Sequence, residues 1–396
     1  MRITFLSVLV VALVPNVADA ATLFVTDGGD SGPGTLRQTV SDAMSGDTIA
    51  FDGVDTVSIT GGDLNIVGKA LIIDGGEGVH ITRSAGTGRL LDIRAGAGQS
   101  FELRNLDFSN GSTNENGGAI EFGVDGSDGI GIIHNCSFFD NEATGSSAEG
   151  GAVDFQGRTL RVELSLFYDN SSGFDGGGIY VDPDTNDFTI LNSTFLRNTA
   201  ERNGGGALLC AFGGTGLISH SSFVGNISTG GNGGGLNVPG CDQIVTFRAN
   251  LVALNTAGGS GADISGSVDS DGFNFIGGDP GIALVSVVDR TRPAYTFNFN
   301  SPLIDAGTCT DTNAEQVAAD QRGIPRPLFG DCDIGSIEYS APLEGQLNAA
   351  VEPPGVNCST GGLRIDIYND YDENGQLTPT DPITDTQFIC NGADGS

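Results

Sequence analysis

The chain has 396 residues and carries 50 acidic against 17 basic side chains, for a net charge of −33. A charge of this sign repels nucleic acid and anionic membranes, which need clustered Lys and Arg, so both are excluded as partners. The 63 glycines and 14 prolines stay below the proportion typical of a disordered chain, so one long folded domain or two ordinary ones are expected.

The first 20 residues are organised like a secretory signal peptide. Arg2 precedes an apolar run from Ile3 to Val14, and Ala18-Asp19-Ala20 supplies the small residues of a cleavage site. The alternative is a membrane anchor, but this run is shorter than the roughly 20 apolar residues that a span requires. The sequence therefore predicts a secreted or cell-surface protein whose mature chain begins near Ala21, with no membrane span after cleavage.

A short helix and a first pair of strands are expected next. Residues 35–44 have the pattern of an amphipathic helix that could cover the open N-terminal end of a stack of strands. Leu64 and Ile66, and then residues 71–73, supply apolar side chains typical of two short strands.

The motif Phe-x-x-Asn returns at a period of about 28 residues through the middle of the chain. Its four copies lie 29, 28 and 28 residues apart: Phe138 to Asn141, Phe167 to Asn170, Phe195 to Asn198 and Phe223 to Asn226. A fixed period in this range indicates stacked structural units. We expect the Phe side chains to form an inward stack. We expect the Asn residues to take the left-handed turn conformation and to bond through their amides to the Asn one coil away.

A Gly-Gly-aliphatic motif precedes each of these copies and marks another strand. Aligning the glycines gives two apolar columns that should face inward: Ile120, Val153, Ile179, Leu208 and Leu236, then Phe122, Phe155, Val181, Cys210 and Val238. The residues between the columns are mostly polar and should face outward, which is the alternation of a strand. Short strands without a helical pattern between them predict an all-β fold, a parallel β-helix over residues 21–341 with about eleven coils.

Seven cysteines in an exported chain suggest disulfides with one thiol left over. Cys309 and Cys332 bracket one short segment and Cys358 and Cys390 another, so these are the expected pairs. Cys136 and Cys210 fall on inward positions of the repeat, where they could be buried small hydrophobic residues, although Cys210 could also bridge to Cys241.

The composition changes after residue 341, and residues 342–396 are expected to form a small β module. Between two strand-like segments lies an acidic loop with the spacing of a calcium site: oxygen donors at positions 1, 3 and 5, Gly at 6 and a carboxylate at 12. The predicted calcium ligands are Asp370, Asp372, Asn374, Gln376 and Asp381. The alternative is an Asx-rich turn that binds nothing.

Together, Gly-Gly-Ala-Ile and Phe-x-x-Asn resemble the repeats of chlamydial polymorphic outer membrane proteins and related bacterial right-handed β-helix proteins. Residues 35–49 look like the opening of that family, and residues 301–307, 320–327 and 333–335 look like its closing cap. The resemblance implies a right-handed parallel β-helix that is secreted or surface-displayed, with adhesion among its functions. The C-terminal segment resembles short Cys-stapled calcium-loop modules.

The repeat predicts no catalytic residue. Lyase chemistry needs a basic group beside cations, and hydrolysis needs paired carboxylates; neither grouping is visible in the sequence. His80, His134 and His220 fall at different offsets of the repeat and are expected at turns or on the surface. Arg322 and Arg326 could clamp an anion, but salt bridges with Asp320 or Asp333 are the simpler expectation.

We therefore expect a non-enzymatic adhesion or interaction rod that recognises an extracellular glycan or a host or cell-surface protein. The alternative is a carbohydrate-active β-helix enzyme, a polysaccharide lyase or glycoside hydrolase, with its site on long loops such as residues 141–149 or 169–175. An aligned cluster of acidic and basic side chains on one outward face would favour the enzyme, whereas a plain Asn, Ser and Thr face would favour binding.

Overall fold

The computed structural model describes residues 20–123, 129–182, 185, 187–210, 214–240, 244–284, 295–298, 300–328, 330–339, 343–359, 361–370, 377 and 383–391. Of the predicted signal peptide, only Ala20 is among them. None of the helices in these ranges has the length and apolarity to cross a membrane.

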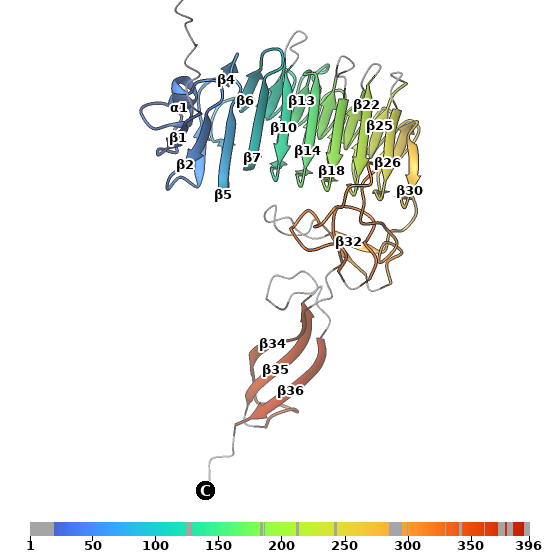
Figure 1. The fold of residues 1–396 in the computed structure, drawn as a ribbon. Coiled ribbons are helices and arrows are strands. Elements are labelled where there is room, and N and C mark those ends of the chain that lie inside the picture. Colours follow the sequence, from blue (N-terminus) through green and yellow to red (C-terminus); the bar gives the residue numbers. More distant parts are fainter. Residues whose placement is uncertain are drawn as a thin grey trace, which may run out of the picture.

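Short strands wind into a parallel β-helix of about nine turns with about 28 residues per coil (Figure 1). Most coils contribute strands to three sheets, called sheets 1, 2 and 3 below, and the strands of the solenoid pair in parallel with their counterparts in the next coil. The solenoid is therefore shorter than the eleven coils expected. Its last strands end at Ile276, and the described residues between 277 and 339 do not continue the winding.

Sheet 1 receives two strands from most coils. One series is β1 (Thr22–Val25), β2 (Thr48–Phe51), β5 (Ile72–Arg83), β7 (Ser100–Ser109), β10 (Ile130–His134), β14 (Thr159–Glu163), β18 (Asp187–Leu191), β22 (Thr215–Ser219), β26 (Ile244–Arg248) and β30 (Asp269–Gly272). The other is β3 (Thr56–Ile59), β11 (Ser137–Phe139), β15 (Leu166–Tyr168), β19 (Thr194–Leu196), β23 (Ser222–Val224), β27 (Leu251–Ala253) and β31 (Phe275–Ile276). The long strands β5 and β7 belong to both series.

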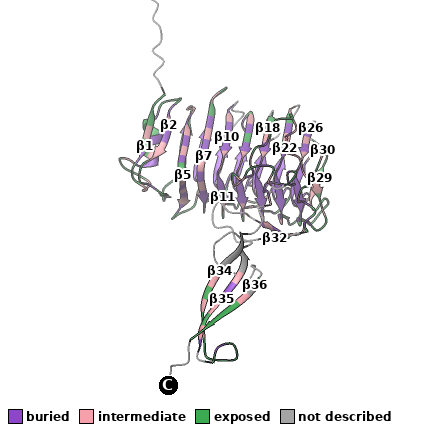
Figure 2. Cartoon of the chain, turned by 60° about the horizontal axis from the view of Figure 1, so that its bottom comes forward, coloured by how far each residue is buried: buried purple, intermediate pink, exposed green. Residues whose placement is uncertain are grey.

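Sheets 2 and 3 complete each circuit. Sheet 2 contains β4 (Leu64–Val67), β6 (Leu91–Arg94), β9 (Ile120–Phe122), β13 (Val153–Phe155), β17 (Ile179–Val181), β21 (Ala207–Leu209), β25 (Leu236–Val238) and β29 (Ile264–Gly266). Sheet 3 consists of two-residue strands: β8 (Ser112–Thr113), β12 (Glu142–Ala143), β16 (Ser171–Ser172), β20 (Thr199–Ala200), β24 (Ile227–Ser228) and β28 (Thr256–Ala257). Buried residues run through all three sheets, which enclose one apolar core (Figure 2).

The register predicted for β21 was wrong by one residue. Ala207 pairs with Ile179 and Leu209 with Val181, so these two face inward, and Leu208 lies in the outward column. The glycine with positive φ, Gly204 in this coil, is followed three residues later by the first inward residue, as in the other coils. Three consecutive glycines concealed which one makes this turn, and a slip of one residue reverses both faces of a strand. Cys210 consequently follows the strand instead of facing the core, and it is disulfide-bonded.

The Phe column forms the predicted inward stack. The rings of Phe138, Phe167, Phe195 and Phe223 are fully buried and lie parallel, with centroids 4.7, 4.8 and 4.6 Å apart in successive coils. Rings at this separation exclude water from the turn beside them and fix the register of adjacent coils.

The Asn column forms the predicted ladder, but not in the predicted backbone conformation. Asn141 donates from Nδ2 to Oδ1 of Asn170 at 3.0 Å, and Asn170 donates in the same way to Asn198 at 2.9 Å. Each amide also donates to the carbonyl of the Phe one coil back, as Asn170 does to Phe138 at 2.9 Å. The left-handed conformation belongs to the residue before the Asn, for example Asp140 with φ 53° and Asp169 with φ 55°. The Asn side chain thus satisfies buried backbone groups at the turn that its neighbour makes.

The N-terminal end carries the predicted helix, α1 (Leu36–Asp42), capped by the Thr35 side chain, which accepts from Gln38 N. Its buried residues Leu36 and Val40 join the apolar core at the first coils, so the helix covers an end that strands would otherwise leave open (Figure 1).

The segment expected to close the C-terminal end instead packs along the side of the solenoid. It follows β32 (Ile282–Leu284) and comprises residues 295–298, 300–328 and 330–339, including β33 (Tyr295–Phe297), and is called the flanking segment below. Its Tyr295, Leu303 and Ile337 bury the outward side chains of sheet 1 on β15, β19, β23 and β27: Leu166, Leu196, Val224, Leu251 and Ala253. The apolar outward positions in these coils thus mark a docking face, which an alignment of the inward columns does not reveal.

Polar contacts fix the flanking segment in place. Tyr295 and Ser222 hydroxyls lie 2.9 Å apart, and Ser336 N donates to Ser222 Oγ at 2.9 Å. His220 is fully buried at the turn beside β23, where its Nε2 lies 2.6 Å from the Thr308 carbonyl oxygen. Burial lowers the pKa of His220 to about 3, with the nearby arginines acting in the same direction, so the ring is neutral and structural.

Arg322 and Arg326 form salt bridges, which is the simpler of the two roles expected from the sequence. Arg322 pairs with Asp320 at 2.7 Å, and Arg326 pairs with Glu338 at 2.7 Å instead of with Asp333, whose backbone carbonyl it contacts. The side chains of both ion pairs are almost fully buried. The predicted disulfide Cys309–Cys332 is present, with a Cα–Cα distance of 5.3 Å.

The C-terminal module is a three-stranded antiparallel sheet of β34 (Leu343–Glu352), β35 (Gly362–Asp370) and β36 (Ile383–Cys390). The predicted disulfide Cys358–Cys390 joins the segment before β35 to the end of β36. Val351 and Ile389, 84% and 58% exposed, flank Leu363 on one face, so this sheet buries little apolar surface of its own (Figure 2). The disulfide therefore supplies restraint that a small core does not.

The Asn ladder gives a direct test of what stabilises the coils. Asn170→Ala leaves the Phe138 carbonyl and the Asn141 amide without partners in a buried turn, so we expect it to lower the free energy of unfolding by about 2–4 kcal/mol. Asn65→Ala, which removes an exposed amide contact, is the matched control and should change it by less than about 0.5 kcal/mol. Equal effects in chemical denaturation would show that the ladder is dispensable.

Candidate functional site

The predicted calcium loop falls almost wholly outside the described residues. Asp370 ends β35, and only its backbone is described, whereas Asp372, Asn374, Gln376 and Asp381 lie outside the described ranges. Within those ranges no group of three or more His, Cys, Asp and Glu side chains is arranged to hold a metal ion. The calcium site stays a prediction.

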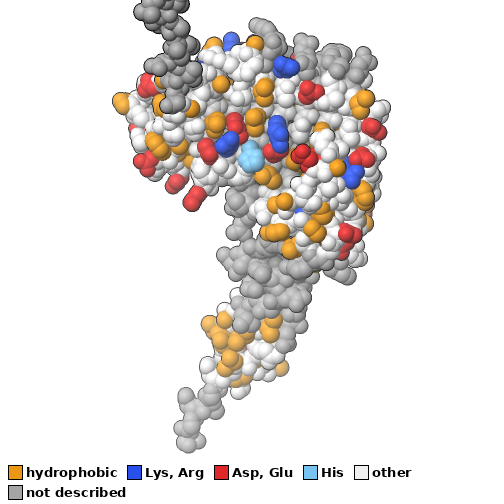
Figure 3. All heavy atoms as spheres, in the orientation of Figure 1, with side chains coloured by type: hydrophobic (Ala, Val, Ile, Leu, Met, Phe, Trp, Pro, Cys, Tyr) orange, Lys and Arg blue, Asp and Glu red, His pale blue; other side chains and the backbone are white. Residues whose placement is uncertain are grey.

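The outward face of sheet 1 carries charges that are paired with their own neighbours. Arg104 contacts Glu102 at 2.5 Å, Arg161 contacts Glu163 at 2.5 Å, and His134 lies 3.4 Å from the same Glu163. Acidic, basic and apolar side chains are mixed on this face, with no large area of one sign (Figure 3). A face whose ion pairs are complete in this way has little charge left to recognise a ligand.

The outward face of sheet 2 is different, because it carries an aligned row of acidic side chains. Asp92, Glu121 and Asp154 occupy the same position in successive strands, and Tyr180 follows in the next. These four residues, three carboxyl groups followed by the Tyr180 hydroxyl, are together called the carboxylate row below. Adjacent members are one coil apart, about 4.8 Å, and none is more than 9% exposed. A row of charges this close and this buried is costly unless protons or partners neutralise it.

Glu149 adds a further carboxyl group beside the row. It precedes Gly150, and the equivalent residues of other coils are Asn116, Asp175, Asn203 and Asn232, whose short side chains cap the next coil. Asp175 Oδ1, for example, accepts from Asn203 N at 2.8 Å and from Asn203 Nδ2 at 3.0 Å. The longer Glu149 side chain lies near Tyr180, which acts on its pKa.

The surroundings of Glu149 favour its protonated form. Burial, followed by the charges of Asp175 and Asp182, raises the pKa of Glu149 to about 7, against the smaller opposing effects of Tyr180 and Arg202. Glu149 therefore holds a proton under mildly acidic conditions, in which an ordinary glutamate has lost it.

Asp154 is the most deeply buried carboxyl group of the row. Its Oδ2 accepts from Gln156 at 2.6 Å and from Asn116 at 3.2 Å, whereas Oδ1 has no hydrogen-bond partner in the described structure. Full burial, with Glu121 and Glu149 nearby, raises the pKa of Asp154 well above its ordinary value. An unsatisfied oxygen in such a place calls for a functional or structural explanation.

Arginine side chains flank the carboxylate row at both ends. At one end Arg89 forms ion pairs with Glu121 and, at 2.9 Å, with Glu115, and Arg94 pairs with Asp92 at 2.9 Å. At the other end the exposed Arg202 lies over the Phe174 ring, 4.4 Å from its centroid, with no described carboxylate within 4 Å. Arg202 is thus an available guanidinium next to Glu149 and Asp175, which both experience its charge.

Sequence reasoning predicted no catalytic residue and missed this cluster. The loops of the enzymatic alternative, residues 141–149 and 169–175, do contain Glu149 and Asp175, but nothing in the sequence singled these out. Two signals were available: acidic residues between the inward columns in successive repeats, and a Glu where other repeats have Asn or Asp before the glycine.

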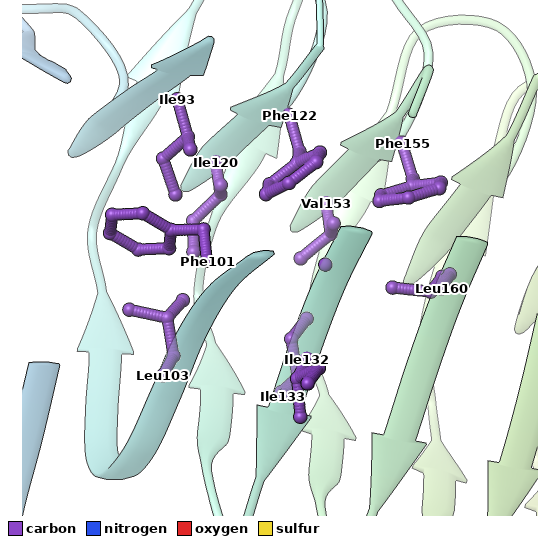
Figure 4. A pocket seen from close by; sticks show the side chains of 11 residues that line it. Ile93, Phe101, Leu103, Ile120, Phe122, Ile132, Ile133, Val153, Phe155 and Leu160 are labelled. Carbon is purple, nitrogen blue, oxygen red and sulfur yellow. The ribbon is translucent and has the colours of Figure 1, made fainter. Parts of the chain in front are cut away.

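The cavity in Figure 4 is not a ligand site. It has a volume of about 10 Å³ and lies inside the coils, among the apolar side chains of Ile93, Phe101, Leu103, Ile120, Phe122, Ile132, Ile133, Val153, Phe155 and Leu160. A space this small and apolar does not hold an ordered water. Gly131 lies in its wall because a Cβ there would come within 2.6 Å of the Phe155 ring.

Comparisons with known proteins show the following. A family model described as a domain of unknown function, DUF7151, matches residues 347–390, which are part of the C-terminal module. No curated protein matches the chain. A similar solved structure is the crystal structure of pectate lyase Pel9A, with a TM-score of 0.37 and 15% identity over 82% of this chain and 98% of that chain. So distant a likeness says nothing about activity.

The proton on Glu149 can be followed by carboxyl carbon NMR, and we expect a titration midpoint near pH 7. Asp175→Asn removes a neighbouring negative charge and should lower that midpoint, whereas Asp52→Asn, distant in the sequence and exposed, should not. From the unfolded pKa near 4.5 up to about 7 the folded chain retains a proton that the unfolded chain loses, so this group's contribution to stability falls as pH rises. A midpoint near 4.5 would contradict this description of the site.

Proposed function

We propose that this protein is an extracellular β-helix rod that binds a glycan on the outward face of sheet 2. The two described disulfides are typical of an oxidising compartment and support an extracellular location. The long in-register core supports a rigid rod, because a solenoid of this kind presents extended surfaces on a fixed scaffold.

The carboxylate row is the observation that carries the proposal. The solenoid itself does not require charge at these positions, since Leu208 and Asn237 occupy the same column in later coils and are equally buried. Burying the carboxyl groups of Asp92, Glu121 and Asp154 lowers the stability of the fold, compared with uncharged side chains at the same positions. Such a cost at one place is typical of a functional surface.

The chemistry of the face favours a glycan over the other candidate, a surface protein. The members of the row are at most 9% exposed, so direct contact falls to the exposed Arg202 guanidinium and the half-buried Phe174 ring, whose donors and apolar surface suit a ligand dense in hydroxyl groups. The net charge of −33 repels polyanions, so an uncharged glycan is favoured. The coils repeat at about 4.8 Å, so an extended polymer can lie along the rod over the buried row and reach the exposed Arg202.

Retention on immobilised neutral polysaccharides, measured as a dissociation constant by affinity electrophoresis, tests this proposal. Arg202→Ala removes an exposed cation that has no ion pair in the described structure, so we expect at least fivefold weaker binding with unchanged stability. Arg161→Ala, on the outward face of sheet 1, is the matched control and should bind as the wild type does. Failure of the wild-type protein to bind any polysaccharide, or equal losses in both variants, would contradict glycan binding on sheet 2.

We also propose that the loop between β35 and β36 binds calcium through Asp370, Asp372, Asn374, Gln376 and Asp381. The support is the ligand spacing. The Cys358–Cys390 disulfide closes the opposite end of the β35–β36 hairpin. A chelator should then increase protease cleavage within residues 357–391 and leave the coils intact, because their ladder bonds involve no metal. Unchanged cleavage of this module would argue against a calcium site.

A further inference from the structure

The C-terminal module is a three-stranded sheet without an apolar core of its own. Among its described side chains only Cys358 and Asp366 are buried. The sheet lies apart from the coils and the flanking segment in Figure 1, and its apolar residues belong to none of the buried clusters of the described chain. A sheet of three strands becomes stable when one face packs against another layer. The described chain does not supply that layer.

One face of the module is polar, and its groups are paired. The Asp366 carboxylate accepts from Arg364 Nε at 2.9 Å and from the Thr386 hydroxyl at 2.8 Å. All three residues lie side by side on neighbouring strands, because Asp366 pairs with Thr386 in the ladder and Arg364 is two residues away on β35. This face can stay in contact with water without a further partner.

The opposite face of the module is apolar and open. Val351, Leu363 and Ile389 lie directly opposite one another across the three strands, and their side chains are 84%, 36% and 58% exposed. Hydrophobic side chains gather on this module in Figure 3. No charged residue is among the described side chains on this side of the sheet. The surface is called the apolar face below and consists of Ala349, Val351, Leu363, Ile365, Ile367 and Ile389.

We propose that the apolar face packs against the same face of a second copy of this chain. Two such sheets, about 10 Å apart, form a small sandwich, and a two-fold axis through it lets one surface serve both copies. A sheet face of this kind is self-complementary, because the row formed by Val351, Leu363 and Ile389 meets an equally apolar row. Each copy thereby supplies the layer that the other lacks.

The charge of the chain favours a second copy at this face over other occupants. A net charge of −33 makes contact between most surfaces of two copies repulsive. The apolar face carries no charge among its described side chains, so two copies can approach each other there. The same net charge disfavours an anionic membrane, and a glycan needs polar groups that this face does not offer.

The size of the apolar face predicts a weak dimer. The eight residues of β36 span roughly 27 Å, and three strands are roughly 14 Å wide, which gives about 400 Å² for each copy. The two copies together bury about 800 Å², less than the roughly 1,200 Å² at which stable interfaces begin. We therefore expect a dissociation constant of about 10–100 µM.

Sedimentation equilibrium of the full chain, from about 1 to 300 µM and at about 0.15 M salt to screen repulsion, tests this proposal. The wild type should change from monomer to dimer over this range. Val351→Glu and Ile389→Glu each place a carboxylate at the contact, so dimerisation should weaken at least tenfold. Both side chains are exposed, so the monomer should fold as before. Phe388→Glu, the next residue of β36 but on the polar face and 38% exposed, is the matched control and should dimerise within threefold of the wild type.

Protease cleavage within the module gives a second measurement. Because a dimer stabilises the sheets that form it, cleavage in the wild type should slow as the protein concentration rises through the dissociation constant. Val351→Glu should remove this dependence on concentration, whereas Phe388→Glu should keep it.

The other outcomes would overturn the proposal. A wild-type protein that stays monomeric over the whole range would exclude the dimer, and species larger than a dimer would exclude a two-fold contact. Equal losses in Val351→Glu and Phe388→Glu, or no loss in either, would exclude the apolar face as the contact. Binding of the monomer to phosphatidylcholine vesicles, abolished by Val351→Glu, would identify a lipid surface as the occupant instead.

Discussion

In-register stacking of each coil on the next is the constraint on which the rest of this structure depends. Because neighbouring strands are parallel and unshifted over most coils, a side chain lies directly against its counterpart about 4.8 Å away. For Phe138 and Phe167 this produces a continuous ring stack, and for Asn141 and Asn170 it produces an amide ladder that satisfies buried turns. Identical neighbours are favourable when the side chain is aromatic or carries both a donor and an acceptor.

The same constraint makes acidic neighbours unfavourable, and this gives the outward face of sheet 2 its chemistry. Glu121 and Asp154 cannot move apart, since the backbone ladder holds them in adjacent coils. Burial is the largest cause that raises the pKa of each group, and nearby carboxylates add to it, Asp92 and Glu115 for Glu121 and then Glu121 and Glu149 for Asp154. Glu149, which lies near Tyr180, enters this field and keeps its proton. The stacked coils therefore hold these carboxyl groups close together and buried, as a cleft holds the side chains of a site in a globular protein.

The flanking segment shows a second use of the repeat. Leu196 and Val224 continue the outward column of Phe139 and Tyr168, and Leu251 follows Ser222 in the neighbouring column. Together they make an apolar face against which Tyr295 and Leu303 pack. Thr194 and Ser222 supply hydroxyl groups for polar contacts at the same face. The flanking segment thereby covers the later coils of sheet 1. The buried carboxyl groups described above lie on the outward face of sheet 2.

The sequence by itself determined the period, the Phe stack, the Asn ladder, the N-terminal helix and the Cys309–Cys332 and Cys358–Cys390 pairs. These follow from local spacing, since each recurs or closes within a short stretch of chain. It did not determine the register of Leu208, the side-on docking of residues 301–335 or the meeting of Glu149 with Asp154 and Tyr180. Those depend on which glycine makes the turn and on which side chains come together across coils. Asp154 and Tyr180, 26 positions apart in the chain, and Glu121 and Asp154, 33 positions apart, become neighbours only when the coils stack, and burial and charge then act between them.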